Sequence, residues 1–101
     1  MIVYSVSVAI DQAIVAEWQE WMQKTHIPDV MATGHFTAHQ FALVVEPPAG
    51  NGRTGFRIEY YCESMKNYEQ YRDHDAAALQ REHTEKYEGR FDASRQLLKS
   101  V

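Results

Sequence analysis

The chain has 101 residues, of which 45% are hydrophobic, and its formal net charge is −4. This length suits one domain over residues 1–101, because a division would leave neither half an adequate core. The acidic balance and the lack of any cluster of Lys or Arg argue against nucleic acid as a partner.

Cys62 is the single cysteine, so no internal disulfide can form. Residues 1–11 alternate in polarity and lack the basic start and apolar core of a signal peptide. No apolar run approaches the ~20 residues that span a bilayer. We therefore expect a cytoplasmic protein that makes no contact with a membrane.

Residues 2–10 alternate between large apolar side chains and small or polar ones, which predicts a strand with one buried face. A helical unit over residues 11–34 follows, with both tryptophans on its apolar face. Asp11 suits the N-cap, and Gly34 suits the C-cap because it can adopt a positive φ. The sequence His26-Ile27-Pro28 predicts a break between two helices, with Pro28 opening the second.

Residues 35–46 end in a β-branched, apolar run and predict a second strand. Its apolar residues change parity, so we expect a bulge near Gln40. Residues 47–55 are rich in proline and glycine and predict a hairpin connection. Residues 54–62 alternate again and predict a third strand, with Cys62 on the buried parity and inert.

Ser64 suits the N-cap of a second long helix, which Gly89 ends. The apolar stripes of its two halves are out of phase, so we expect a kink within Asp73-His74-Asp75. Residues 90–98 predict the last strand.

The order of these elements is βαββαβ, which predicts an α+β fold of the ferredoxin-like type. Its four-stranded antiparallel sheet would carry both helical units on one face. The opposite face would be polar, with small serines in the first strand and charges in the third: Ser5, Ser7, Arg57, Glu59, Tyr61, Asp92, Ser94 and Gln96. Such a face is either solvated or packs against a second copy of the chain.

Five stretches carry a resemblance to a known family: MIVYSVSVAID, WQEWM, HIPDVMATGHF, YEQYRDH with ALQREH, and GRFDASRQLL. Together they resemble, from Met1 to Val101, a short bacterial family known only as a domain of unknown function. By this likeness the chain belongs with the dimeric α+β barrels, in which two ferredoxin-like subunits pack sheet to sheet. That superfamily includes cofactor-free monooxygenases, haem-degrading monooxygenases and ring isomerases. The segment His26 to Gly34 also resembles the ethyl-ether-degradation branch of the superfamily.

Three residues are candidates for catalysis, each with a structural alternative. His83 would face the sheet from the second helical unit, as an acid–base group or as a satisfied core histidine. His26 is a candidate acid or base, or a side chain that bonds the free carbonyls at the end of the first helix. Arg95 would point under the helices and need Asp75, Glu82 or a bound anion, or a bulge would turn it to solvent.

Trp21, Tyr60 and Tyr4 are candidates to line a ligand pocket between helices and sheet, or they are simply core. The sequence contains no HExxH, CxxC or carboxylate cluster, so we expect no metal site. His35 and His39 would lie about 13 Å apart along a strand and could not chelate together. We also expect no obligatory cofactor.

Three functions fit these observations. The first is binding of a small aromatic or anionic molecule between helices and sheet, with the chemistry of a cofactor-free monooxygenase or isomerase. The second is a non-catalytic dimeric interaction module whose interior is filled. The third is haem binding, which requires His83 to face a flat cavity of porphyrin width.

Overall fold

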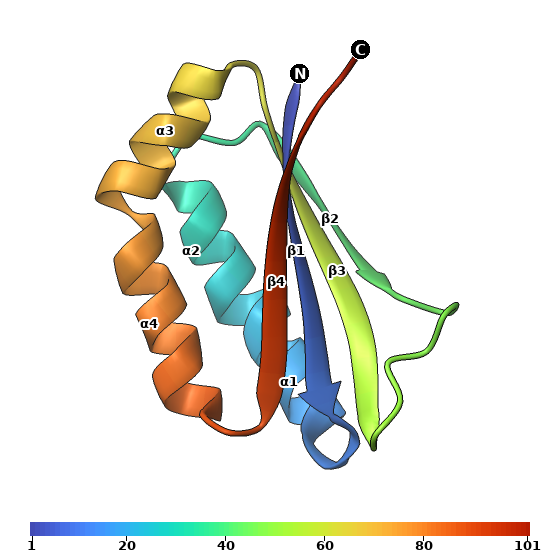
Figure 1. The fold of residues 1–101 in the computed structure, drawn as a ribbon. Helices are drawn as coiled ribbons and strands as arrows, with labels where there is room; N and C mark the ends of the chain where they lie inside the picture. Colours follow the sequence, from blue (N-terminus) through green and yellow to red (C-terminus); the bar gives the residue numbers. More distant parts are fainter.

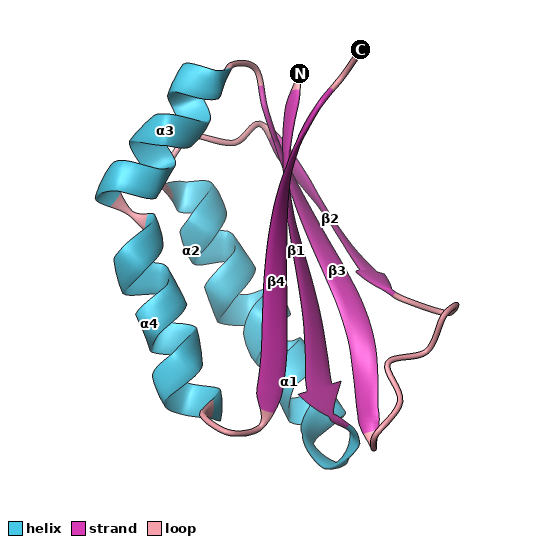
Figure 2. Cartoon of the chain, viewed as in Figure 1, coloured by secondary structure: helices cyan, strands magenta, loops and turns pink.

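The computed structural model describes residues 1–101 and contains a four-stranded antiparallel sheet in the order β2-β3-β1-β4. The strands are β1 (Ile2–Asp11), β2 (Ala38–Leu43), β3 (Arg53–Cys62) and β4 (Phe91–Lys99). All helices cover one face of this sheet, and the chain termini lie at the same end of the fold (Figures 1 and 2). The predicted ferredoxin-like α+β fold is therefore confirmed.

Each helical unit consists of two helices. These are α1 (Val15–Trp21) with α2 (Ile27–Ala32), and α3 (Met65–His74) with α4 (Ala76–Tyr87). A 3₁₀ turn, Gln12–Ile14, leads into α1, and a π-helical segment, Met22–His26, joins α1 to α2. None of the helices is long and apolar enough to cross a membrane.

The strand pairing explains the alternation seen in the sequence. Tyr4 and Val8 of β1 lie opposite Tyr60 and Phe56 of β3, and all four are buried beneath the helices. Trp18 of α1 is fully buried and packs its ring against Phe56, with 5.0 Å between the ring centroids. Alternate residues of the central strands therefore form the floor of the core, as the period of two predicted.

The first helical unit differs from its prediction at both ends of α1. The predicted break at His26 is wrong. The backbone stays helical from α1 to α2, and the two helices are joined by the wider turns of the π-helical segment. Pro28 lies in the first turn of α2, as predicted, and a wider turn before it relieves the clash between a proline ring and the preceding turn's carbonyl.

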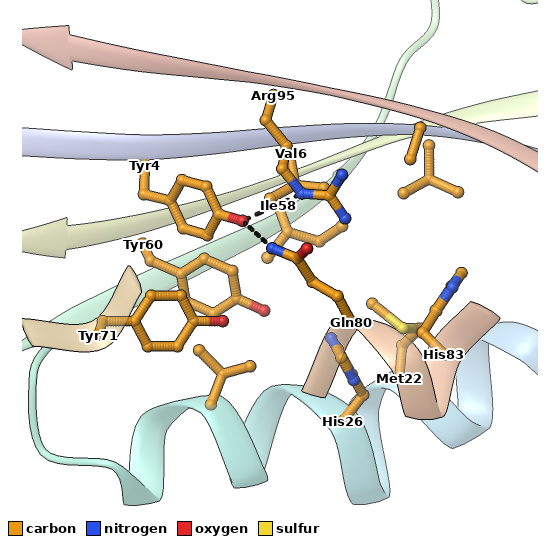
Figure 3. Close-up of a pocket in the computed structure, with 13 residues that line it drawn as sticks. Tyr4, Val6, Met22, His26, Ile58, Tyr60, Tyr71, Gln80, His83 and Arg95 are labelled. Carbon is orange, nitrogen blue, oxygen red and sulfur yellow. Dashed lines mark hydrogen bonds between the residues drawn. The ribbon is translucent and has the colours of Figure 1, made fainter. Parts of the chain in front are cut away.

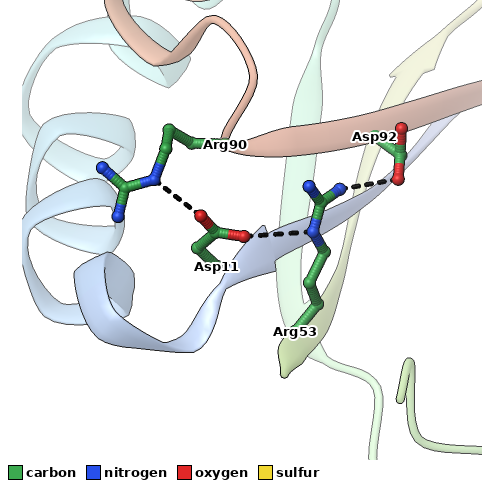
Figure 4. Close-up of polar contacts among 4 residues, drawn as sticks. All are labelled: Asp11, Arg53, Arg90 and Asp92. Atoms are coloured by element: carbon green, nitrogen blue, oxygen red, sulfur yellow. Dashed lines mark hydrogen bonds and ion pairs between the residues drawn. The ribbon is translucent and has the colours of Figure 1, made fainter. Parts of the chain in front are cut away.

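Asp11 precedes the first helical turn, but its side chain makes no capping bond. Its carboxylate accepts hydrogen bonds from Arg53 Nε at 3.1 Å and Arg90 Nε at 2.6 Å, while Arg53 also donates to Asp92 (Figure 4). Arg90 above all, and Arg53 with it, lowers the pKa of this carboxyl group. In place of the predicted cap, an ion-pair network joins the ends of β1, β3 and β4 at one end of the sheet.

The predicted bulge near Gln40 is wrong. β2 begins at Ala38, later than residue 35, and pairs with β3 without interruption from Ala38 to Leu43. Phe36 caused the apparent change of parity. It lies before the strand and enters the core from the preceding loop, where it packs against Tyr71 with 4.9 Å between the centroids.

The kink in the second helical unit is confirmed. Ser64 Oγ accepts a hydrogen bond from the amide of Asn67 and so caps α3, and Asp75 separates α3 from α4. His35 reaches this break and contacts the Asp75 carboxylate at 3.0 Å. Gly89 has a φ of +75° and ends the unit before β4, which joins the sheet as predicted.

The other face of the sheet carries no helix (Figure 1). Ser5 and Ser7 of β1 lie on it opposite Glu59 and Arg57 of β3, as predicted. Ser5 is buried, and its hydroxyl has no hydrogen-bond partner. A hollow of about 340 Å³ separates this face from the segment that follows β2.

Candidate functional site

A cavity of about 30 Å³ lies between the sheet, the first helical unit and α4 (Figure 3). Three of the four strands and both helical units contribute to its wall: Tyr4, Val6, Val8, Met22, His26, Val30, Ile58, Tyr60, Tyr71, Gln80, His83, Ala93 and Arg95. Most of these residues are buried, but Ala93 and Arg95 are exposed and Val6, His26 and Gln80 are half-buried. The cavity therefore reaches the surface between α4 and β4, and its present volume suits about two water molecules.

His83 projects from α4 and is 7% exposed. The indole Nε1–H of Trp18 donates a hydrogen bond to His83 Nε2 at 2.9 Å, so the neutral imidazole carries its hydrogen on Nδ1. Burial lowers the pKa of His83 to about 4, and the charges of His26 and Arg95 add to this effect. Near neutral pH His83 is therefore uncharged and can donate only through Nδ1.

His26 is the last residue of the π-helical segment and packs edge-on against His83 at the cavity wall, with 5.7 Å between the ring centroids. Its Nδ1 is buried without a hydrogen-bond partner, so the predicted bond to a helix carbonyl is not formed there. Burial lowers the pKa of His26 to about 4, with a smaller effect of Arg95 and an opposing one of Asp29. His26 is therefore a neutral imidazole with an unused nitrogen, on a type of helical segment that is frequent at functional sites.

Arg95 lies on the helix side of the sheet, opposite Val6. Its Nε donates to Tyr4 Oη at 3.1 Å, and Gln80 Nε2 donates to the same oxygen at 3.4 Å (Figure 3). The predicted pairing with Asp75 or Glu82 is not observed, since Asp75 contacts His35. Because β4 is an edge strand and Arg95 is exposed, the guanidinium needs no buried carboxylate.

The hydroxyl groups of Tyr4, Tyr60 and Tyr71 converge on the cavity from two strands and α3 (Figure 3). Burial raises the pKa values of Tyr60 and Tyr71 far above the ordinary value, so both remain protonated donors. Tyr4 Oη accepts two hydrogen bonds, which leaves its own hydrogen free to donate. The candidates Tyr4 and Tyr60 therefore lie where the sequence placed them.

Trp21, the third predicted ligand residue, does not line the cavity. Its ring stacks on the ring of His26, with 5.3 Å between the centroids, and lies 5.8 Å from the centroid of His83. Trp21 therefore packs against both imidazoles without lining the cavity itself. Two polar lining residues, Tyr71 and Gln80, were absent from the sequence-based site, as were the apolar residues of the wall. Gln80 lies three residues before His83, a spacing that places both on one face of α4 and could have identified it.

The chain has no group of three or more His, Cys, Asp or Glu side chains that could hold a metal ion. The residues of the cavity wall do not fit haem. His83 Nε2, the nitrogen that would bind iron, is occupied by Trp18, and the cavity of about 30 Å³ is far too small for a porphyrin. The site instead offers neutral imidazoles, hydroxyl donors and one guanidinium.

Solved structures with the same fold cover nearly all of the chain. An ethyl tert-butyl ether d (EthD) family protein from Bacillus halodurans is 14% identical, with 100% of both chains covered and a TM-score of 0.73. A dimeric ferredoxin-like protein from an uncultured marine organism is 12% identical over 100% of this chain and 95% of that one, with a TM-score of 0.69.

A monooxygenase of Streptomyces coelicolor, solved in complex with the ligand nanaomycin D, is 15% identical. The match covers 99% of this chain and 88% of that one, with a TM-score of 0.61. At these identities the likeness shows the fold alone.

A search of proteins with curated functions found no match. The family model of a domain of unknown function, DUF4286, matches residues 1–101, and the chain therefore belongs to this family.

Proposed function

We propose that the protein binds a small aromatic or anionic molecule between the helices and the sheet and transfers a proton to or from it without a cofactor. Isomerases and cofactor-free monooxygenases carry out such chemistry. The observation that carries this proposal is His26, a neutral imidazole at the cavity wall whose buried Nδ1 has no protein partner.

The residues around the cavity would have different roles in this proton transfer. His26 would be the general base, because an unprotonated imidazole near a bound C–H or O–H group can accept its proton. His83 would donate a hydrogen bond through Nδ1, since Trp18 occupies its other nitrogen. Arg95 and the hydroxyls of Tyr4 and Tyr60 would stabilise negative charge that develops on the ligand.

A ligand larger than water requires the cavity to widen between α4 and β4. The side chains of Gln80 and Arg95 narrow the opening on this side, and they are held by single hydrogen bonds of 3.4 Å and 3.1 Å to Tyr4. Breaking one such bond costs about 1 kcal/mol, which ligand binding can offset. Met22 on the inner wall adds a side chain that adapts easily to new shapes.

The likeness to the monooxygenase solved with the ligand nanaomycin D supports a small-molecule ligand in this fold. This support is an analogy between folds, since 15% identity carries no catalytic residue across.

Thermal-shift screening of the wild type against quinones and phenolic acids tests binding. Hydrogen–deuterium exchange at an acidic C–H of any compound that binds, followed by NMR in D₂O, tests catalysis. We expect His26→Ala to slow this exchange by about a hundred- to ten-thousand-fold, because a positioned base typically contributes that much. His74→Ala, at an exposed position of α3, is the matched control and should not change the rate. Equal exchange rates in both variants would refute the role of His26.

A second candidate function is a non-catalytic dimeric module. The small volume of the cavity, about 30 Å³, favours it, because known ligand sites commonly exceed about 300 Å³. The same screen separates the two functions. If no compound stabilises the wild type, the helix–sheet interior is structural and function lies in partner contacts.

We also propose that the protein is a homodimer joined through the sheet face without helices. That face combines small serines with neighbouring opposite charges at Arg57 and Glu59, so a two-fold arrangement allows charges to pair between copies. The hollow of about 340 Å³ beside Ser7 leaves room for side chains of a partner.

A further inference from the structure

The wall of the cavity has an unusual charge balance. The chain has 14 acidic and 10 basic Lys and Arg residues, yet the cavity wall contains no Asp or Glu and a single charged side chain, Arg95. The two histidines of the wall are uncharged near neutral pH. The cavity of an acidic protein therefore carries one positive charge with no internal counter-ion.

The guanidinium of Arg95 is largely unused by the protein. Only its Nε makes a hydrogen bond, to Tyr4 Oη, and Arg95 takes part in no ion pair, whereas Arg53, Arg72 and Arg90 each contact a carboxylate. The two terminal nitrogens of Arg95 are left to bind another group. Their planar fork matches the two oxygens of a carboxylate.

The remaining polar groups of the wall are mostly donors. The hydroxyls of Tyr60 and Tyr71 make no hydrogen bond within the protein and stay protonated, and Tyr4 still has its own hydrogen to donate. His83 can donate through Nδ1. A wall with excess donors and an unbalanced positive charge is complementary to a ligand that is rich in acceptors and negatively charged.

We propose that the ligand of this cavity is a small carboxylate with an apolar or aromatic body, whose carboxylate is bound by the Arg95 guanidinium at the opening between α4 and β4. The tyrosine rings pack against the body of the ligand, and the tyrosine hydroxyls lie within the cavity to bind further oxygen atoms. This inference rests on the proposed function, and it specifies the charge and the anchoring group of the ligand. A neutral quinone or phenol would leave Arg95 unpaired.

The test compares benzoate with benzamide, which have nearly the same shape and differ in charge. Propionate and propionamide form a second, smaller pair. Affinities are measured by NMR titration at pH 7 for the wild type, Arg95→Gln and Arg81→Gln. Arg81 is the matched control, because it lies exposed on α4 outside the cavity and its substitution removes the same net charge.

We expect the carboxylates to bind the wild type at least about ten-fold more tightly than the amides, since hydrogen bonds to charged groups are worth that much. Arg95→Gln should abolish this preference without changing the affinity for the amides. Arg81→Gln should change neither affinity by more than about two-fold, because exposed charges are screened. The melting temperature of Arg95→Gln should stay near that of the wild type, since the side chain is exposed.

Equal binding of carboxylates and amides to the wild type would overturn the inference while leaving the proposed function in place. So would a carboxylate preference that persists in Arg95→Gln. If the probes do not bind but neutral quinones do, the inference alone is overturned. If no compound binds, either to the wild type or to Gln80→Ala with its opened cavity, both the inference and the proposed function are overturned.

Discussion

Trp18 and His83 lie 65 residues apart in the chain, and one hydrogen bond between them decides what His83 can do. The indole N–H can only donate, so it must meet the lone pair of Nε2. This bond fixes the tautomer of His83 and leaves Nδ1–H as its one remaining polar group. A free imidazole can act as a base, a hydrogen-bond donor or a metal ligand, but with Nε2 occupied the His83 side chain can act only as a hydrogen-bond donor.

The Trp18–His83 bond should appear as a coupling energy. His83→Ala leaves the buried indole N–H without a partner, so we expect it to lower the free energy of unfolding by about 1–3 kcal/mol. Trp18→Phe removes the donor, and in that background His83→Ala should cost less. Urea denaturation of both single variants and the double variant measures the difference, with the exposed His74→Ala as control. Purely additive losses would show that the two side chains are not coupled.

At the scale of single residues, the sequence predicted which face of a helix His83 lies on but not its hydrogen-bond partner. The helical spacing correctly placed His83 and Tyr87 on the buried face of α4. The sequence could not identify Trp18 as the partner of His83, because that contact depends on how two helical units pack. It also could not place Arg95, whose side of the sheet follows from the register of β4 with β1.

At the scale of whole elements, strands and helix ends were predictable where they depend only on interactions between residues that are close in the sequence. Ser64 and Gly89 act as predicted because a cap and a positive φ need only neighbouring residues. Asp11 does not cap, because Arg53 at the start of β3 and Arg90 in the turn before β4 bind its carboxylate. Local rules fail where tertiary partners offer stronger hydrogen bonds.

The π-helical segment and α4 meet through the half-buried imidazole of His26 and the buried imidazole of His83, so their packing should depend on pH. The pKa values of His26 and His83 fall to about 4 in the fold, against 6.5 for a free histidine. Between these values the unfolded chain binds more protons than the native state, so stability falls as pH falls. The contribution of the two imidazoles to stability should be constant well above pH 6.5 and level off below about pH 4, with a slope of up to about 1.4 kcal/mol per pH unit for each imidazole.

Chemical denaturation at pH 7.5 to 4.5 measures this slope, which His26→Asn should reduce. Asp11 does not interfere, because the pKa of its carboxyl group is lowered from 3.8 and its stabilising effect is lost only at lower pH. A stability that stays flat over this range would show that the two imidazoles are not held neutral by burial.

At the scale of the whole molecule, the two faces of the sheet differ in composition and in what covers them. One face buries the core and the cavity beneath the helices. The other has small and charged residues, and it buries Ser5 without giving its hydroxyl a partner. A second copy of the chain would cover this face, including the exposed Leu98 of β4.

We therefore expect sedimentation at micromolar concentration to give twice the 11.7 kDa mass of one chain. A stable interface should bury at least about 1,000 Å² in total. Ser7 lies in the middle of this face, between Arg57 and Ser94, so Ser7→Arg places a long, charged side chain where two sheets would meet and should give a monomer. Gln70→Arg adds the same charge on the exposed surface of α3 and should remain dimeric. A wild-type monomer would mean that the serines and charges of this face are simply solvated, and the polarity pattern of the sheet would then reflect solubility and not assembly.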